Sequence, residues 1–420
     1  MKKILIFLFF GFILGLLLSP PLLSAQQDMK QWEFQSVDTM KLSRDLAREK
    51  GKSPAFDQAI EEEMMRIADT GATYVAIATP YDEEFLPYLN RFVKAARAQK
   101  LHIWFRGNFA GWEKWFSYPA ITRTQHMQKT KAFILNNPDL FEDGDIFTAC
   151  PECENGGPGD PRQTKDVKGH RLFLINEYKL TKDAFSSMGK DVKSNYNSMN
   201  GDVARLIMDR QTTAALDGVV VIDHYVARPE DLKKDIDFFA RRTGGRVVLG
   251  EIGAPVPDIH GTMTQEEQAQ WLSEALKALS HTDSLIGLNY WVGSGGSTQL
   301  WDSTGKKRMA ADVLSTFYRG KAVQITVVDK NSTPLSGVSI RGLLSPLSTD
   351  KKGIVQVPYS LGVKKLTISK KGYYSQTIEL PDSKDQMQVV LDEEKKGLIE
   401  RIKILFNKVI HVRINLTIDF

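Results

Sequence analysis

The chain has 420 residues, of which 42% are hydrophobic and 25% are charged, a composition that excludes disordered and fibrous proteins. It carries 55 basic and 51 acidic residues, so the formal net charge is only +4 and nucleic acid is not expected as a partner. This length accommodates one large domain and a smaller one.

The N-terminal residues have the pattern of an export signal. MKK precedes an apolar run from Ile4 to Leu18, and Ser19 and two prolines then break the helix. The run is short for a membrane span, but residues 21–25 contain no clean small-x-small cleavage site. We therefore expect a signal peptide or an uncleaved anchor over residues 1–25, and a secreted or cell-surface protein.

Strands and helices alternate regularly between residues 31 and 320. The predicted strands cover residues 33–40, 72–78, 101–105, 145–150, 192–196, 218–222, 246–250 and 285–291. The predicted helices cover residues 54–71, 84–99, 125–136, 171–180, 203–215, 229–241, 264–279 and 309–317, with an N-cap at Ser53 and a capping box of Thr264 and Glu267. Eight such units predict an α/β fold, a (β/α)₈ TIM barrel. A doubly wound sheet fits less well, because no Gly-rich phosphate turn follows an early strand.

The pattern changes to period-two alternation near Ala322. Five alternating stretches separated by turn signals predict a small C-terminal all-β sandwich over residues 321–392. Residues 393–420 read as a basic amphipathic helix, which packs on its own domain or, as the alternative, attaches to a membrane.

Cys150 and Cys153 are the only cysteines, and they follow the fourth predicted strand in CxxC spacing. Two thiols are too few for a closed zinc site, and no metal is expected. We predict a local disulfide, with a thioredoxin-like redox pair as the alternative. The Gly- and Pro-rich residues 151–162 are predicted to form an exposed loop.

The carboxyl ends of barrel strands meet at one mouth, where barrel enzymes place their chemistry. The polar and aromatic residues predicted there are Asp38, Arg106, Asn108, Glu152, Glu154, His224, Tyr225, Glu251 and Trp291, with Trp112, Trp115 and Trp301 in nearby loops. We expect the tryptophans to stack on sugar rings, although some of them, Trp115 in particular, could equally pack loops. His224 fits a hydrogen-bonded framework histidine better than a proton carrier.

Glu251 ends the apolar strand in RVVLGEIGAP, and its flanking glycines let a ligand approach closely. The alternative for this residue is a solvated loop acid. Glu152 follows the fourth strand, nearly opposite, so the two carboxyls fit two-carboxylate glycoside hydrolysis. Burial near Phe147 favours the neutral form of Glu152 as the acid, and a hydrogen bond from Tyr225 keeps Glu251 ionised for attack.

The acid after the fourth strand, HY after the sixth, GEIG after the seventh and the tryptophan ending the eighth together resemble clan A glycoside hydrolases of the cellulase and mannanase type. The resemblance implies an acid/base at Glu152, a nucleophile at Glu251, a tyrosine touching the nucleophile at Tyr225 and a sugar platform at Trp291. Many members have Asn where this chain has Pro151, and Glu154 is a second candidate acid. We favour Glu152, because we expect Glu154 to lie in a loop that bends outward.

Residues 322–392 are similar to carboxypeptidase regulatory-like, transthyretin-type modules through VVDKNSTPLSGVSI, STDKKGIVQV and KKGYYSQTIEL. That resemblance implies a spacer or attachment module. The sequence as a whole predicts an exported retaining β-glycosidase that acts on a polysaccharide or glycoconjugate and needs no cofactor. A non-catalytic surface glycan-binding protein on the same barrel is the alternative, and a redox protein is the third.

Overall fold

The computed structural model describes residues 32–319, 322–342, 346–358, 365–380 and 386–394. The predicted signal or anchor, and all of the predicted tail beyond residue 394, lie outside the described residues. Within the described ranges, no helix combines the length and hydropathy that a membrane crossing requires.

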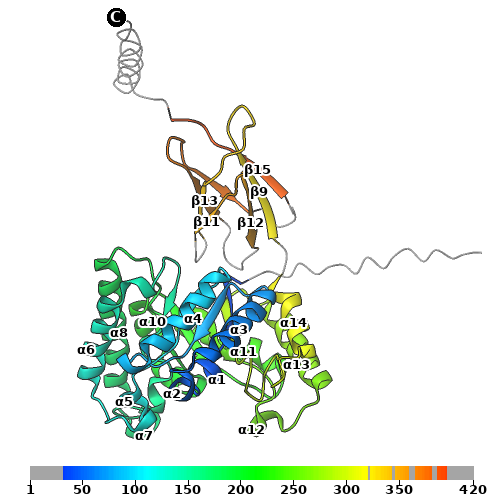
Figure 1. The fold of residues 1–420 in the computed structure, drawn as a ribbon. Helices are drawn as coiled ribbons and strands as arrows, with labels where there is room; N and C mark the ends of the chain where they lie inside the picture. Colours follow the sequence, from blue (N-terminus) through cyan, green and yellow to red (C-terminus); the bar gives the residue numbers. More distant parts are fainter. Residues whose placement is uncertain (1–31, 320–321, 343–345, 359–364, 381–385, 395–420) are drawn as a thin grey trace, which may run out of the picture.

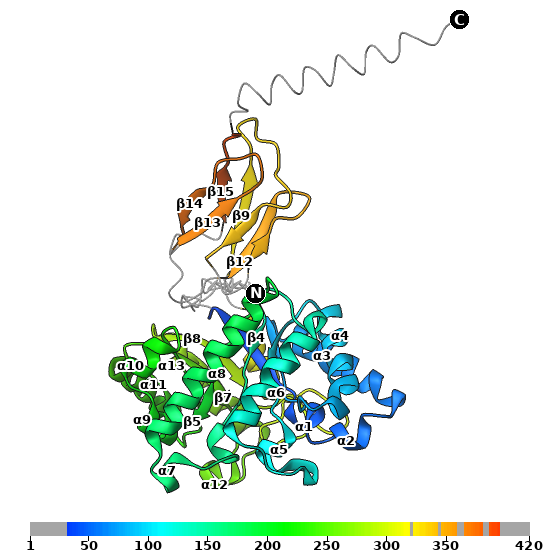
Figure 2. The same cartoon turned by 90° about the vertical axis from the view of Figure 1, so that its left-hand side faces the viewer.

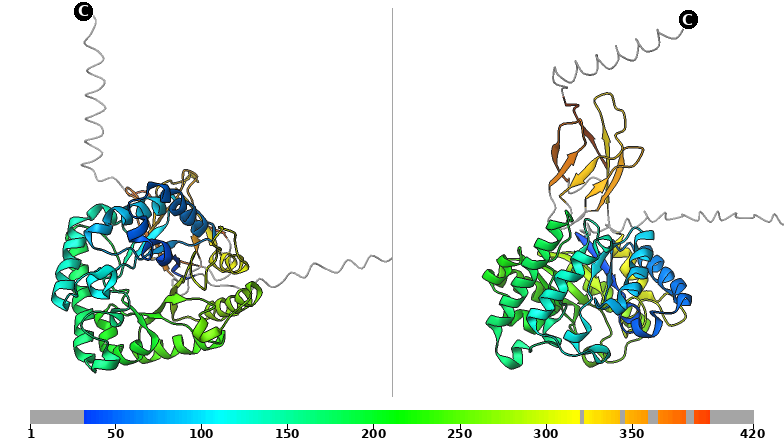
Figure 3. Two further views of the ribbon diagram at one scale, coloured as in Figure 1. Left: turned by 60° about the horizontal axis from the view of Figure 1, so that its bottom comes forward. Right: turned by 60° about the vertical axis from the view of Figure 1, so that its left-hand side comes forward.

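Eight parallel strands form one curled sheet in the order β4-β3-β2-β1-β8-β7-β6-β5. The barrel closes where β4 meets the segment just before β5: Phe147 donates from its backbone N–H to the carbonyl of Lys193 at 2.8 Å, and Ile146 bridges the same residue. Helices encircle the strands, as the end-on view in Figure 3 shows. The predicted (β/α)₈ barrel is confirmed. Its strands are β1 (Phe34–Asp38), β2 (Tyr74–Ile77), β3 (His102–Phe105), β4 (Ile146–Phe147), β5 (Ser198–Asn200), β6 (Val219–Asp223), β7 (Arg246–Ile252) and β8 (Leu285–Tyr290).

The long helices cover the outside of the sheet, whereas several short ones follow strand ends at the mouth. The outer helices are α3 (Asp57–Asp69), α4 (Leu86–Ala98), α6 (Arg123–Asn136), α8 (Val167–Ser187), α9 (Gly201–Ile207), α10 (Arg210–Ala215), α11 (Pro229–Thr243), α13 (Gln265–Leu279) and α14 (Met309–Tyr318). The short α-helices are α1 (Met40–Ser43), α2 (Ala47–Lys50), α5 (Ala110–Glu113), α7 (Pro161–Thr164) and α12 (Pro257–His260). Single 3₁₀ turns occur at Pro54–Phe56 (η1), Glu83–Phe85 (η2), Trp115–Ser117 (η3), Pro138–Leu140 (η4) and Cys153–Asn155 (η5).

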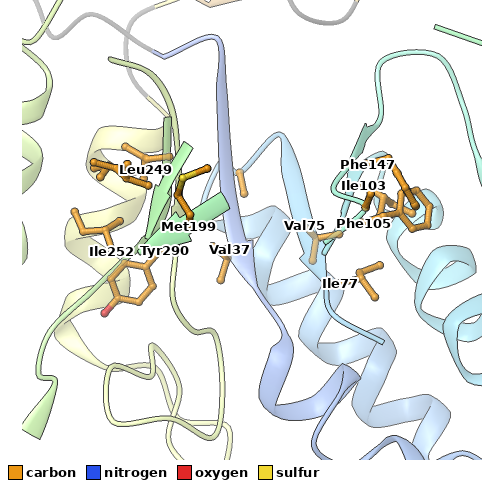
Figure 4. Close-up of a cluster of buried hydrophobic side chains, with 14 of the residues drawn as sticks. Val37, Val75, Ile77, Ile103, Phe105, Phe147, Met199, Leu249, Ile252 and Tyr290 are labelled. Carbon is orange, nitrogen blue, oxygen red and sulfur yellow. The ribbon is translucent and has the colours of Figure 1, made fainter. Parts of the chain in front are cut away.

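Alternation along the strands sorts side chains between two apolar clusters. On β2, Val75 and Ile77 join the large cluster between sheet and helices, while Tyr74 and Ala76 join a smaller cluster inside the barrel. Figure 4 shows part of the outer cluster. Because strand side chains alternate with period two, the inward position after Trp104 of β3 falls on Arg106. A charged layer therefore lies directly above the apolar interior of the barrel.

Predicted boundaries fail around the fourth and fifth strands. β4 is only Ile146–Phe147, so the predicted extension to Cys150 is wrong, and β5 lies at Ser198–Asn200 rather than at residues 192–196. The loop after β4 is not simply exposed, since Pro151, Cys153 and Glu154 are buried. A disulfide joins its two cysteines, as predicted, and tightens this segment into η5.

Helix starts follow the capping signals in part. The predicted capping box of Thr264 and Glu267 is present at the start of α13. Ser53 occupies the N-cap position, as predicted, but of the 3₁₀ turn η1 that precedes α3, and its side chain makes no cap hydrogen bond. A second capping box, formed by Thr122 and Gln125, opens α6.

The C-terminal β region has two small sheets and its own apolar core. One sheet has the order β11-β10-β13-β14 and the other β12-β9-β15. Their inward side chains, among them Val323, Ile325, Ile340 and Leu366, form a cluster separate from the barrel core. Figures 1 and 2 draw these sheets at the end of the barrel away from α5, α7 and α12, hence away from the mouth. The strands are β9 (Ala322–Val328), β10 (Ser339–Arg341), β11 (Leu347–Ser348), β12 (Ile354–Pro358), β13 (Lys365–Ser369), β14 (Gln376–Glu379) and β15 (Gln386–Val390).

Candidate active site

Arg106 is the centre of the polar layer at the barrel mouth. Its guanidinium is fully buried and lies 3.0 Å from Asp223, 3.2 Å from Glu251 and 3.3 Å from Asp38. It also donates to the carbonyl of Gly250 at 2.6 Å. One positive charge thus faces three carboxyls in a medium that solvates charge poorly. Burial raises the pKa values of Asp38 and Asp223, and the charge of Arg106 acts downward on both.

Two neighbours of Glu251 favour its ionised form, against the effect of burial. Arg106 approaches its Oε1 at 3.2 Å, and the hydroxyl of Tyr225 donates to its Oε2 at 2.7 Å. Burial raises the pKa of Glu251 to about 7, Arg106 and the Tyr225 hydrogen bond act downward, and the charge of Glu152 acts upward. The solvated-loop alternative is wrong, because Glu251 is buried within β7. The contact between Tyr225 and Glu251 is the one that the resemblance implies.

Glu152 is only partly buried, and its backbone is in the left-handed region, with φ 44° and ψ 50°. Its N–H donates to the carbonyl of Ser198 at 2.9 Å, and the disulfide between Cys150 and Cys153 spans it. A non-glycine residue keeps such a backbone only where its surroundings impose it, and such positions concentrate at functional sites. Burial and the charge of Glu154 raise the pKa of Glu152. The sequence predicts that Glu152 lies at the mouth, but it does not predict the left-handed backbone of this residue.

Glu154 does not bend outward, and that expectation is wrong. Its side chain is 3% exposed, and its Oε1 accepts from the backbone N–H of Asn200 at 2.7 Å and from the Asn200 side chain at 3.0 Å. Burial raises its pKa as well. Glu154 is therefore anchored to the end of β5, while Glu152, on the other side of Cys153, keeps part of its surface exposed.

His224 has the framework role that its sequence context favoured, and the structure gives no support for it as a proton carrier. Its Nε2 lies 2.8 Å from Asp235 of α11, and its ring covers Gly201 at the start of α9. Only its backbone N–H reaches the nucleophile candidate, through the carbonyl of Glu251 at 3.0 Å. The imidazole therefore ties α11 to the end of β6.

The predicted sugar-stacking tryptophans divide into two groups. Trp291 is partly exposed at the end of β8, and its ring lies edge-on to Tyr225 with centroids 6.3 Å apart. Trp112 is 1% exposed and stacks on Phe173, and Trp301 is 3% exposed, so their assignment as substrate platforms is wrong. Trp115 is partly buried, with the guanidinium of Arg44 4.7 Å from its ring centre.

Asn108 is also buried, so the structure gives no support for its predicted contact with substrate. Its side chain is hydrogen-bonded to His126 of α6 and to Glu113 of α5. The sequence analysis missed Glu113, His126 and Asp223. Asp223 could have been found, because period two along GVVVID points it inward. Glu113 and His126 lie on helices and carry no comparable signal. Among the described residues, no three His, Cys, Asp or Glu side chains are grouped to hold a metal ion.

The barrel resembles solved glycoside hydrolases. An alanine variant of GH5_18 from Bifidobacterium longum subsp. longum, in complex with Manβ1-4GlcNAc, is 12% identical with a TM-score of 0.52, over 72% of this chain and 84% of that chain. GH5_18 from Streptomyces cattleya, in complex with GlcNAc, is 13% identical with a TM-score of 0.51, over 71% of this chain and 85% of that chain. No family model and no curated protein matches the sequence. At these identities the likeness shows the barrel fold alone.

Proposed function

We propose that this protein is a retaining glycoside hydrolase with Glu251 as the nucleophile and Glu152 as the acid and base. The observation that carries the proposal is the clamp on Glu251, whose two oxygens meet Arg106 at 3.2 Å and Tyr225 at 2.7 Å. Both partners favour the anion, and together they fix the direction of its free lone pairs. A purely structural carboxylate at a barrel mouth needs no such orientation.

The two carboxyls divide their roles through their environments. Their charges oppose each other, since ionised Glu152 raises the pKa of Glu251. The proposal assigns the proton of the pair to Glu152, because Glu251 is the carboxyl that Arg106 and the Tyr225 hydroxyl both contact directly. Glu251 attacks the anomeric carbon and forms a glycosyl ester while Glu152 protonates the departing oxygen. Glu152 then takes a proton from water, whose oxygen displaces Glu251 from the anomeric carbon.

Trp291 supports a saccharide as the substrate. Its ring is partly exposed beside Tyr225, and its indole N–H is buried without a hydrogen-bond acceptor among the described residues. A saccharide ring would supply a stacking partner for the exposed part of this indole. We extend the proposal to β-linked polysaccharides or glycoconjugates. The Manβ1-4GlcNAc in the Bifidobacterium complex makes β-linked hexosides a sensible first choice for assay.

Export is part of the proposal. The first residues have the composition of a secretion signal, and the Cys150–Cys153 disulfide belongs to a class of bonds that persist in oxidising compartments. Both cysteines are almost fully buried, whereas a redox pair needs an accessible thiol, so the structure lends no support to the redox alternative.

The test is hydrolysis of a panel of β-linked polysaccharides and aryl β-glycosides, with product anomers followed by ¹H NMR. Glu251→Gln should abolish turnover while saccharide binding survives. Glu152→Ala should slow natural glycosides far more than aryl glycosides with good leaving groups, and azide should partly restore the second step. Glu154→Ala should cost much less, and the reverse pattern would make Glu154 the proton donor. Saccharide binding without release of reducing ends by the unaltered protein would overturn the proposal and leave a glycan-binding protein.

A further inference from the structure

The loop that carries Glu152 lies directly against Trp112 of α5. The Trp112 carbonyl accepts from the backbone N–H of Gly157 at 2.8 Å, and its indole Nε1 donates to the carbonyl of Cys153 at 3.3 Å. One contact falls on the residue that follows Glu152, and the other falls beyond the turn η5. A single residue of α5 therefore holds this loop at two points.

Two glycines allow the loop to come this close. A Cβ added at Gly157 would lie 2.2 Å from Cε2 of Trp112, and one added at Gly156 would lie 2.6 Å from the Trp112 carbonyl oxygen. Gly157 also has a φ of +58°, which residues with a side chain rarely adopt. The loop is therefore packed on the ring and the backbone of Trp112 without space for another side chain.

Trp112 is itself fixed by the helices behind it. Its side chain is 1% exposed, stacks on Phe173 of α8 with ring centroids 5.1 Å apart, and meets the His126 ring of α6 edge-on at 4.8 Å. The His126 ring lies 2.5 Å from Glu177 and 2.9 Å from the side-chain oxygen of Asn108. Because these partners are buried as well, Trp112 offers the loop a rigid surface.

The strand β5 holds the same loop from its other side. The backbone N–H of Glu152 donates to the carbonyl of Ser198 at 2.9 Å, and Glu154 accepts from the N–H of Asn200 at 2.7 Å. Between these supports Glu152 has a φ of 44° and a ψ of 50°, a conformation that a residue with a side chain keeps only where its surroundings impose it. Trp112 and β5 together supply those surroundings.

We propose that Trp112 is a positioning residue that acts through Glu152: by holding Cys153 and Gly157, it keeps the Glu152 carboxyl where the leaving oxygen is protonated. The inference rests on the proposed function for its catalytic meaning. The physical claim, that Trp112 fixes the backbone of residues 152–157, stands on the contacts alone. It gives Trp112 a role in place of the predicted sugar stacking.

The first test compares two leaving groups in Trp112→Phe, which keeps an aromatic ring in the core and removes the donor to Cys153. A displaced acid slows glycosides whose leaving group needs a proton and hardly affects those with good leaving groups. We expect kcat/KM to fall about tenfold on a natural β-glycoside and less than about twofold on an activated aryl glycoside. A general loss of folded protein would lower both values equally.

Gly156→Ala disturbs the same contact from the side of the loop and leaves Trp112 unaltered. Gly156 has a φ of −147°, which alanine adopts without strain, so the clash with the Trp112 carbonyl is the main perturbation. The ratio of the two kcat/KM values should change in the same direction as in Trp112→Phe. Gly156→Ala thus provides the comparison if Trp112→Phe fails to fold.

Trp271→Phe is the matched control. Trp271 of α13 is 5% exposed, and its Nε1 donates to the carbonyl of Ala227 at 3.1 Å, in the loop after β6. The substitution therefore removes the same kind of buried hydrogen bond at a distance from Glu152. We expect the ratio of the two kcat/KM values to stay at that of the wild-type protein.

Hydrogen–deuterium exchange of the peptide spanning residues 150–157 tests the physical claim without turnover. Trp112→Phe should speed exchange in this peptide several-fold, because the loop opens more readily, whereas Trp271→Phe should leave it unchanged. The inference is overturned by an unchanged ratio of rates or unchanged exchange in Trp112→Phe, or by equal effects in Trp271→Phe. If the wild-type protein cleaves no glycoside, the proposed function fails, and the exchange measurement still decides whether Trp112 fixes the loop.

Discussion

Replacing Glu63 with glutamine is expected to stabilise the barrel at alkaline pH and to change little at acidic pH. Glu63 lies on α3, is 1% exposed, and accepts from the hydroxyl of Ser294 at 2.7 Å. Its nearest cation, Arg66, is 4.0 Å away, and its Oε1 has no hydrogen-bond partner among the described residues. Glutamine retains the acceptor for Ser294 and removes the buried charge.

The size of the stability gain follows from the difference between the pKa of Glu63 in the folded and unfolded states. Burial raises the pKa of Glu63 from 4.5 to about 7, against smaller downward effects of Ser294 and Arg66. The folded state therefore holds this proton at pH values where the unfolded chain has lost it. Both states are protonated well below pH 4.5, and above about pH 7 the folded state bears the full cost of an ionised buried acid. A shift of this size corresponds to about 3 kcal/mol at pH 8.

Thermal unfolding followed by circular dichroism at pH 4.5 and pH 8 provides the assay for Glu63→Gln. For a domain of this size, about 3 kcal/mol corresponds to a rise in Tm of roughly 5 to 10 °C at pH 8. Glu62→Gln, one residue earlier on the same helix and partly exposed, is the matched control and should change the Tm little at either pH. Equal gains for Glu63→Gln at both pH values would refute the linkage argument, as would a loss at pH 8.

Three other changes have definite expected outcomes. Tyr225→Phe removes the 2.7 Å hydrogen bond to Glu251, so kcat/KM should fall about ten- to a hundredfold and the acidic limb of its pH profile should move to higher pH; an unchanged limb would show that the contact does not set the ionisation of Glu251. Cys150→Ser with Cys153→Ser opens a short loop and should cost about 2 kcal/mol of stability, seen in urea unfolding, while activity falls further than stability accounts for. A chain cut after residue 320 should fold and cleave small soluble substrates, because the β9–β15 region has its own apolar core; aggregation of that fragment would place the domain boundary elsewhere.

Much of the fold can be predicted from local sequence patterns. Apolar runs such as residues 247–249 identify strands buried on both faces, and Thr264 with Glu267 marks a helix start that the structure contains. The fifth strand was misplaced because residues 192–196 and Ser198–Asn200 are both short and weakly periodic. Which of the two segments becomes β5 depends on which one reaches β6 and pairs with it, and only the tertiary structure determines that.

The sequence by itself determined which residues end the barrel strands, and hence that Glu251, Tyr225, Arg106 and Trp291 gather at one mouth. The regularity of the (β/α)₈ fold makes this possible, since strand order fixes position around the ring. Period two along β1, β3 and β6 also turns Asp38, Arg106 and Asp223 inward, although only the first two were singled out.

Only the tertiary structure decided which mouth residues face the ligand space and which are covered. Trp112 is buried because α8 brings Phe173 against its ring, and Asn108 is enclosed by His126 of α6 and by Glu113. Glu154 is drawn inward by the backbone of Asn200, a partner far along the chain. Burial and hydrogen bonding between distant segments produce no periodic pattern in the sequence, so the sequence does not predict them. They depend on how helices and loops pack across the strand ends.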